Sequence, residues 1–108
     1  MTDKSKKFNL YIDTTEYGKV TFKLEKTAFS KRRPSSKSFQ VKPQESDKIL
    51  IFLQEFLQKN KIQNPKSKFQ KIIVYKKAEG SFTGLRIAAA IAQALSLAWG
   101  VPVKVVSK

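Results

Sequence analysis

Few side chains in this sequence are suited to catalysis. It contains no histidine and no cysteine, so the commonest general base and metal ligand is missing, as are thiolate chemistry and disulfides. Eight carboxylates remain, and they form no cluster along the sequence. The residue types therefore predict a protein that is not an enzyme, with no catalytic residues, no bound metal and no cofactor.

One glycine-bounded loop, residues 80–84, is a candidate anion site. It leads into a predicted helix, whose first N–H groups are free to bind an anion. The alternative is a local role, in which Ser81 or Thr83 caps the helix while Gly80 and Gly84 allow close backbone packing. We favour the cap.

The charge balance is a strong compositional signal. With 22 lysines and arginines against eight acidic residues, the formal net charge is +14, which favours an acidic partner such as nucleic acid. The densest basic segment is 31–37, and its candidate RNA contacts are Lys31, Arg32, Arg33 and Lys37. A lysine-rich surface can also serve solubility alone, and such a loop can be merely solvated. Both interpretations stay open at this point.

The glycine-bounded loop lies within a predicted strand–helix–strand unit. Residues 70–75 and 101–106 are short and β-branched, as buried strands are. Between them, residues 81–99 predict a helix of roughly five turns. A strand, a helix and a strand of these lengths form a βαβ unit with parallel strands and a right-handed crossover.

The circumference of this long helix is more apolar than one sheet face can cover. At about 100° per residue, its thin polar strip carries Arg86, Gln93 and Ser96, with Ala89 among them. Such a helix is either sandwiched against another helix of its own protein or docked on another protein. We favour docking. The candidate interface residues on this helix are Phe82, Thr83, Arg86, Ile87, Ala90, Ile91, Ala94 and Ala98.

Three further strands are predicted before residue 42. Residues 8–13 and 19–25 form a hairpin, and the second of these strands alternates strictly between apolar and polar side chains. A third strand begins at 27–30, is interrupted by the basic loop 31–37 and resumes at 38–41.

A second helix is predicted from Pro43 to about Lys61. Its polar face includes Ile51, which is a further candidate partner contact, although single exposed aliphatic side chains are common. Its apolar arc consists of Ile49, Leu50, Phe52, Leu53, Phe56 and Leu57.

The run Gly80-Ser81-Phe82-Thr83-Gly84-Leu85-Arg86-Ile87, with a strand before it and an alanine-rich helix and Gly100-Val101-Pro102 after it, resembles the signature of the TsaB (YeaZ-like) family. These proteins are noncatalytic members of the actin-like ATPase superfamily and take part in making threonylcarbamoyladenosine in tRNA. The chain departs from the family at Ala78-Glu79, where Gly-Pro is usual. The resemblance extends over nearly the whole chain.

The fold implied is α/β, a single half of the actin-like ATPase or ribonuclease H-like fold. Its element order is βββαβαβ, with a mixed five-stranded sheet in the order 3-2-1-4-5 and two helices. Residues 1–7 are expected to be a flexible basic tail, and residues 8–108 a single domain without the second domain that family members usually have. No apolar run is long enough to span a bilayer and the N-terminus is no signal peptide, so we expect a cytoplasmic protein.

The resemblance also implies a function. Family members assemble through their two helices with a catalytic TsaD-type subunit or with a second copy, so a TsaD-like protein, a homodimer or both are the expected partners, with tRNA as a possible third. In the superfamily, the turn after the first strand binds nucleotide phosphates. Here Asp13-Thr14-Thr15 is followed by Glu16 and the bulky Tyr17, so we expect a hairpin cap and no ATP site. The alternative function is a stand-alone basic RNA-binding module.

Overall fold

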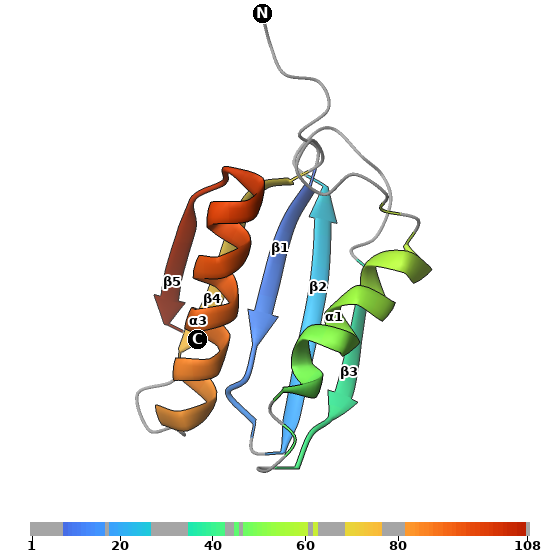
Figure 1. Ribbon diagram of the computed structural model, residues 1–108, viewed down its shortest axis with the longest axis vertical. Helices are drawn as coiled ribbons and strands as arrows, with labels where there is room; N and C mark the ends of the chain where they lie inside the picture. Colours follow the sequence, from blue (N-terminus) through green and yellow to red (C-terminus); the bar gives the residue numbers. More distant parts are fainter. Residues whose placement is uncertain are drawn as a thin grey trace, which may run out of the picture.

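The computed structural model describes residues 8–16, 18–26, 35–42, 45, 47–60, 62, 69–76 and 82–107. They form a five-stranded sheet with two helices. In chain order the elements are β1 (Phe8–Asp13), β2 (Lys19–Lys26), β3 (Ser35–Gln40), α1 (Lys48–Lys59), β4 (Phe69–Lys76), α3 (Phe82–Trp99) and β5 (Val103–Ser107). Both helices lie on the same face of the sheet (Figure 1). Neither is long and apolar enough to cross a membrane.

The sheet has the order β3-β2-β1-β4-β5, as expected. β1 pairs antiparallel with β2 and parallel with β4, and β5 continues the parallel half. Alternation along each strand therefore sends one set of side chains toward the helices and the other set to the opposite face. Leu10 and Ile12 of β1, for example, pair with Leu24 and Phe22 of β2 on the helix side.

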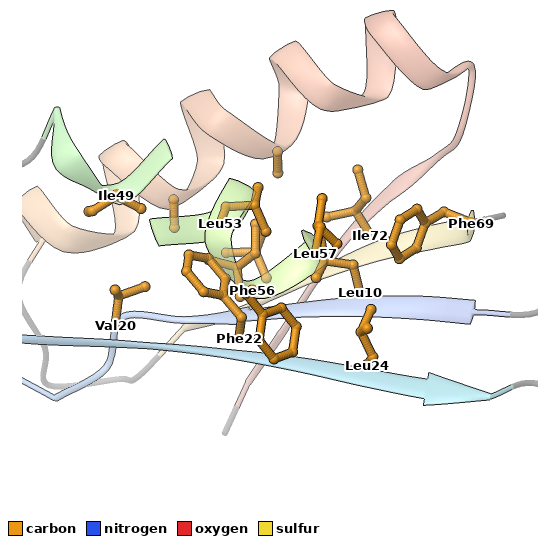
Figure 2. Packing of buried hydrophobic residues seen from close by; sticks show 14 of the residues in the cluster. Leu10, Val20, Phe22, Leu24, Ile49, Leu53, Phe56, Leu57, Phe69 and Ile72 are labelled. Carbon is orange, nitrogen blue, oxygen red and sulfur yellow. The ribbon is translucent and has the colours of Figure 1, made fainter. Parts of the chain in front are cut away.

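The hydrophobic core lies between the sheet and the two helices. The buried side chains of α1 face those of β1 and β2 across this layer (Figure 2). Phe22 is fully buried, and its ring centroid lies 5.9 Å from that of Phe56 and 6.0 Å from that of Phe39. Both Phe22 and Phe39 point toward the helices, so neither can stack a base on the other face.

The second helix is shorter than predicted, because the chain turns before entering it. The backbone N–H of Glu45 donates to the carbonyl of Lys42 at 2.8 Å, which closes a tight turn where the prediction had a first helical turn. Helix α1 then begins at Lys48. It ends at Lys59, since the side-chain amide of Asn60 donates to the Phe56 carbonyl at 2.8 Å and caps the last turn.

The second part of the third strand, predicted at 38–41, begins earlier, at Ser35. Ser35 and Lys37 belong to β3 and pair with Leu24 and Phe22 of β2, so the last part of the expected basic loop 31–37 is strand. Antiparallel pairing with a long β2 is the reason, because the ladder extends the strand past the point where its apolar residues stop. The predicted strand start at 27–30 and Lys31, Arg32 and Arg33 lie outside the described residues.

Helix α3 ends on a glycine in the left-handed conformation. Gly100 has φ +66°, and a Cβ added there would meet no atom within 4 Å. The N–H groups of Gly100 and Val101 both donate to the carbonyl of Ser96, at 2.8 and 3.2 Å, and the Ser96 hydroxyl contacts the Val101 carbonyl. This αL cap turns the chain sharply from α3 into β5.

Replacing Gly100 by alanine should therefore lower the free energy of unfolding by about 1 kcal/mol, because a Cβ is disfavoured at positive φ. There is space for the methyl group, so the cost is conformational. Gly100→Asn should cost less, since asparagine tolerates this conformation. Urea denaturation of the two variants measures the difference, and equal stability of Gly100→Ala and the unmodified protein would contradict this account of the cap.

Candidate docking surface

Helix α3 presents one fully exposed line of side chains to solvent. Arg86, Ala90, Gln93 and Leu97 follow a spacing of four, three and four residues, which keeps them on one side of a helix, and all four are exposed. Leu97 is 88% exposed. A leucine this open, next to two exposed alanines, Ala94 and Ala98, makes the C-terminal half of this helix surface apolar.

A second line runs beside the first and is divided between core and surface. It consists of Ile87, Ile91, Ala94 and Ala98, with the same spacing. Ile87 and Ile91 are half-buried and pack against the core, whereas the two alanines are exposed. Of the predicted contacts, Arg86, Ala90, Ala94 and Ala98 thus lie on the free surface, and the two isoleucines serve mainly the fold.

The exposed strip is rotated from the predicted one. Ser96 and Ala89 were expected on it and are half-buried instead. The C-terminal cap explains Ser96, because its hydroxyl contacts the Val101 carbonyl and its own carbonyl receives two N–H groups. Phe82 and Thr83 begin α3, but their side chains lie outside the described residues, as does Ser81.

Helix α1 adds two exposed aliphatic side chains on the same side of the sheet. Ile51 is 52% exposed, as its position among polar residues predicted. Leu50 is 45% exposed, although it was expected on the buried arc. Ile49 and Leu53, at 4% and 1% exposed, fill the space beneath, so α1 has no need of Leu50 for its packing. We call Ala90, Ala94, Leu97 and Ala98 of α3 the helix patch; Leu50 and Ile51 are exposed on the other helix, α1.

Sequence reasoning missed Leu97 and Leu50. The signal for Leu97 was present, because it lies eleven residues after Arg86 and therefore on the same side of an α-helix. Its apolar character made it look like a core residue. Leu50 had no such signal, since it borders the apolar arc and only the tilt of α1 on the sheet decides its exposure.

Lys37 lies on the helix side of β3, next to Lys59 of α1. The side-chain hydrogen bond with the Lys59 amine, and then the like charge of that amine, lower the pKa of Lys37. The Nζ of Lys37 is also 5.3 Å from the centroid of the Phe39 ring. These side chains border an open cavity of about 360 Å³ between β3 and α1, lined by Lys37, Phe39, Glu55, Phe56, Gln58 and Lys59.

The turn after β1 is held by its own side chains. One carboxylate oxygen of Asp13 accepts hydrogen bonds from the backbone N–H of Thr15 at 2.9 Å and from its hydroxyl at 2.6 Å. This is the local cap expected at this position. Among the described residues, no three acidic side chains lie close enough together to hold a metal ion.

Comparison with known proteins identifies the family. Residues 40–108, more than half of the chain, match the model of the TsaD family, described as tRNA N6-adenosine threonylcarbamoyltransferase. The chain therefore belongs to this family. No curated protein matches it.

Solved structures share the fold. YeaZ from Pseudomonas aeruginosa has a TM-score of 0.74 and 23% identity, over 94% of this chain and 44% of its own. A second structure, of an uncharacterized protein with similarity to peptidase YEAZ from Pseudomonas aeruginosa, has a TM-score of 0.75, again with 23% identity, over 94% and 43%. Thermus thermophilus RuvC has a TM-score of 0.60 and 14% identity, over 93% and 63%.

These likenesses confirm the predicted YeaZ-like resemblance and the half of a ribonuclease H-like fold. The chain spans less than half the length of the two YeaZ-type chains.

Proposed function

We propose that the protein is a cytoplasmic, noncatalytic subunit in the threonylcarbamoyl modification of tRNA, and that its helix patch docks a TsaD-like catalytic subunit. The family match and the YeaZ-like fold support the pathway. The lack of histidine and cysteine, and the engagement of Asp13 by Thr15, support a role without chemistry of its own.

The exposure of Leu97 is the observation that carries the docking role. A side chain that is 88% exposed contributes little to the packing of its own fold, yet it stands among small exposed alanines that would let a partner helix approach closely. Burying such a patch should supply most of the affinity, at about 25 cal/mol per Å² of apolar surface. Charge on the rest of the molecule would act mainly on the association rate and its salt dependence.

Replacing Leu97 by lysine should weaken binding to a TsaD-type protein by at least about tenfold, the usual effect of losing a central apolar contact. The fold should be unaffected, because a cation in the last turn of a helix is favoured by the helix dipole and α3 has no basic residue there. Size-exclusion chromatography with multi-angle light scattering and a titration by calorimetry measure the association.

Ser107→Lys is the matched control, since it adds the same charge at another exposed position, on β5. Ile91 is unsuitable as a test site, because it packs against the core. If Leu97→Lys binds the TsaD-type protein as tightly as Ser107→Lys does, the helix patch is not the docking site. If Leu97→Lys instead breaks up a homodimer and leaves binding to the TsaD-type protein unchanged, the patch serves self-association and the proposed partner is wrong.

A further inference from the structure

The face of the sheet opposite the helices carries a second, chemically different surface. Both described helices lie on one side (Figure 1), and none of the other described segments forms a helix that could cover the opposite side. The pairing of the strands orders the side chains on this face into rows. We call it the open face.

Two adjacent rows cross all five strands. The first contains Ser36, Lys23, Tyr11, Ile73 and Lys104, and the second contains Ser38, Thr21, Asp13, Tyr75 and Val106, each from β3 to β5. An aromatic and an aliphatic side chain thus lie between two lysines in the first row. Lys23 and Lys104 are three strands apart, a span of about 14 Å at the usual strand spacing.

Two tyrosines form the aromatic centre of the open face. The rings of Tyr11 and Tyr75 are stacked, with centroids 5.7 Å apart and an interplanar angle of 20°. The Nζ of Lys23 lies 4.6 Å from the centroid of the Tyr11 ring. Both tyrosines are half-buried, so each ring is held in place while part of its surface faces solvent.

The orientation of Tyr11 is fixed by a hydrogen bond. Its hydroxyl donates to a carboxylate oxygen of Glu25 at 2.7 Å. Burial and this hydrogen bond raise the pKa of Tyr11 to about 12, so the phenol keeps its proton and keeps donating even in alkaline solution. Glu25 is thereby engaged within the protein, as Asp13 is by Thr15.

The charge of the open face favours an anion. Lys71 pairs with Asn9 on the same face, so three lysines, Lys23, Lys71 and Lys104, surround the tyrosine pair. The two carboxylates of these strands, Asp13 and Glu25, are both occupied by internal hydrogen bonds. A protein partner fits this surface poorly, because the centres of protein interfaces are depleted in lysine.

We propose that the open face binds single-stranded nucleic acid, with bases stacked on the Tyr11–Tyr75 pair and phosphates held by Lys23, Lys71 and Lys104. Aromatic side chains held on a sheet among basic residues are the means by which proteins bind unpaired bases. The net charge of +14 supplies long-range attraction for the same ligand. This site lies on the opposite side of the sheet from the helix patch and is independent of the docking role.

A direct test maps the site on the unmodified protein. A short uridine oligonucleotide, added to isotope-labelled protein, should shift the backbone amide signals of β1, β2, β4 and β5 and leave those of α1 and α3 in place. Duplex RNA of the same length should bind more weakly, since its bases are not free to stack. Shifts confined to the helices would overturn the proposal.

Variants then separate stacking from charge. Tyr75→Leu should weaken binding of the oligonucleotide about tenfold, whereas Tyr75→Phe keeps a ring and should bind like the unmodified protein. Lys104→Gln should weaken binding and reduce its dependence on salt. Lys59→Gln, on the helix side next to Lys37, is the matched charge control and should have a smaller effect.

Three results would refute the site. The first is an equal loss of RNA affinity in Lys59→Gln and Lys104→Gln. Such a result would indicate that the positive charge of the whole protein attracts the RNA without a defined site. The second is unchanged RNA affinity in a folded Tyr75→Leu variant, whether or not that variant still binds the TsaD-type protein. The third is an unchanged salt dependence of RNA binding in Lys104→Gln, a substitution that changes only an exposed side chain. Leu97→Lys should still bind the oligonucleotide, so this proposal and the docking role can fail separately.

Discussion

Phe22→Ala should lower the free energy of unfolding by about 3–5 kcal/mol, the usual cost of removing a buried phenylalanine ring. Phe22 is fully buried, and its ring connects the stacked pair Phe39–Phe52, with centroids 4.7 Å apart, to Phe56. The cavity would therefore open between β2, β3 and α1. A loss of this size is a large fraction of the 5–15 kcal/mol typical of a whole domain.

Urea denaturation followed by circular dichroism measures this loss. Phe22→Leu is the matched control and should cost clearly less, because leucine fills most of the volume. If Phe22→Ala cost less than about 1 kcal/mol, the ring would not be a central part of the core. If Phe22→Ala fails to fold, Phe22→Leu can still be compared with Phe39→Leu. Position 39 is half-buried, so Phe39→Leu should lower the free energy of unfolding less than Phe22→Leu does.

Ala92→Leu should lower the free energy of unfolding by about 1–3 kcal/mol, because the larger side chain cannot fit where α3 meets the sheet. Ala88 and Ala92 are both fully buried, and α3 packs mainly on β4. The two small side chains let the helix backbone approach the strands closely. Leucine at position 92 would force the helix away from β4.

Ala90→Leu is the matched control, since it makes the same substitution two residues away on the exposed side of α3. Alanine and leucine have similar helix propensities, so this variant should stay within about 0.5 kcal/mol of the unmodified protein. Thermal and urea denaturation of the pair measure the contrast. Equal effects at positions 90 and 92 would show that the assigned orientation of α3 is wrong.

Most of the fold could be predicted from the sequence. The strict alternation of β2 and the apolar length of α3 gave the element order, and the YeaZ-like signature from Gly80 onward implied the sheet order. The ends of the helices and strands were less predictable, because they are decided by hydrogen bonds that the periodicity of apolar residues does not reveal. The turn between Lys42 and Glu45 delays α1, and pairing with β2 brings Lys37 into β3.

The candidate sites were predictable in part. Arg86, Ala90 and Ile51 were expected to be exposed, and they are. Leu97 was hidden among core-like residues, and the exposure of Leu50 depends on how α1 lies on the sheet. The Tyr11–Tyr75 pair could not be found from spacing, since the two rings meet only through the parallel pairing of β1 with β4.

A single layer of strands separates the helix patch from the Tyr11–Tyr75 pair, since both helices lie on one face (Figure 1). An occupant of one side shares no side chain with an occupant of the other. Ligands of the two sides would therefore not compete for the same side chains. If both proposals hold, one molecule can carry a TsaD-like subunit on its helices and a nucleic acid strand on the opposite face of the sheet, in a ternary complex.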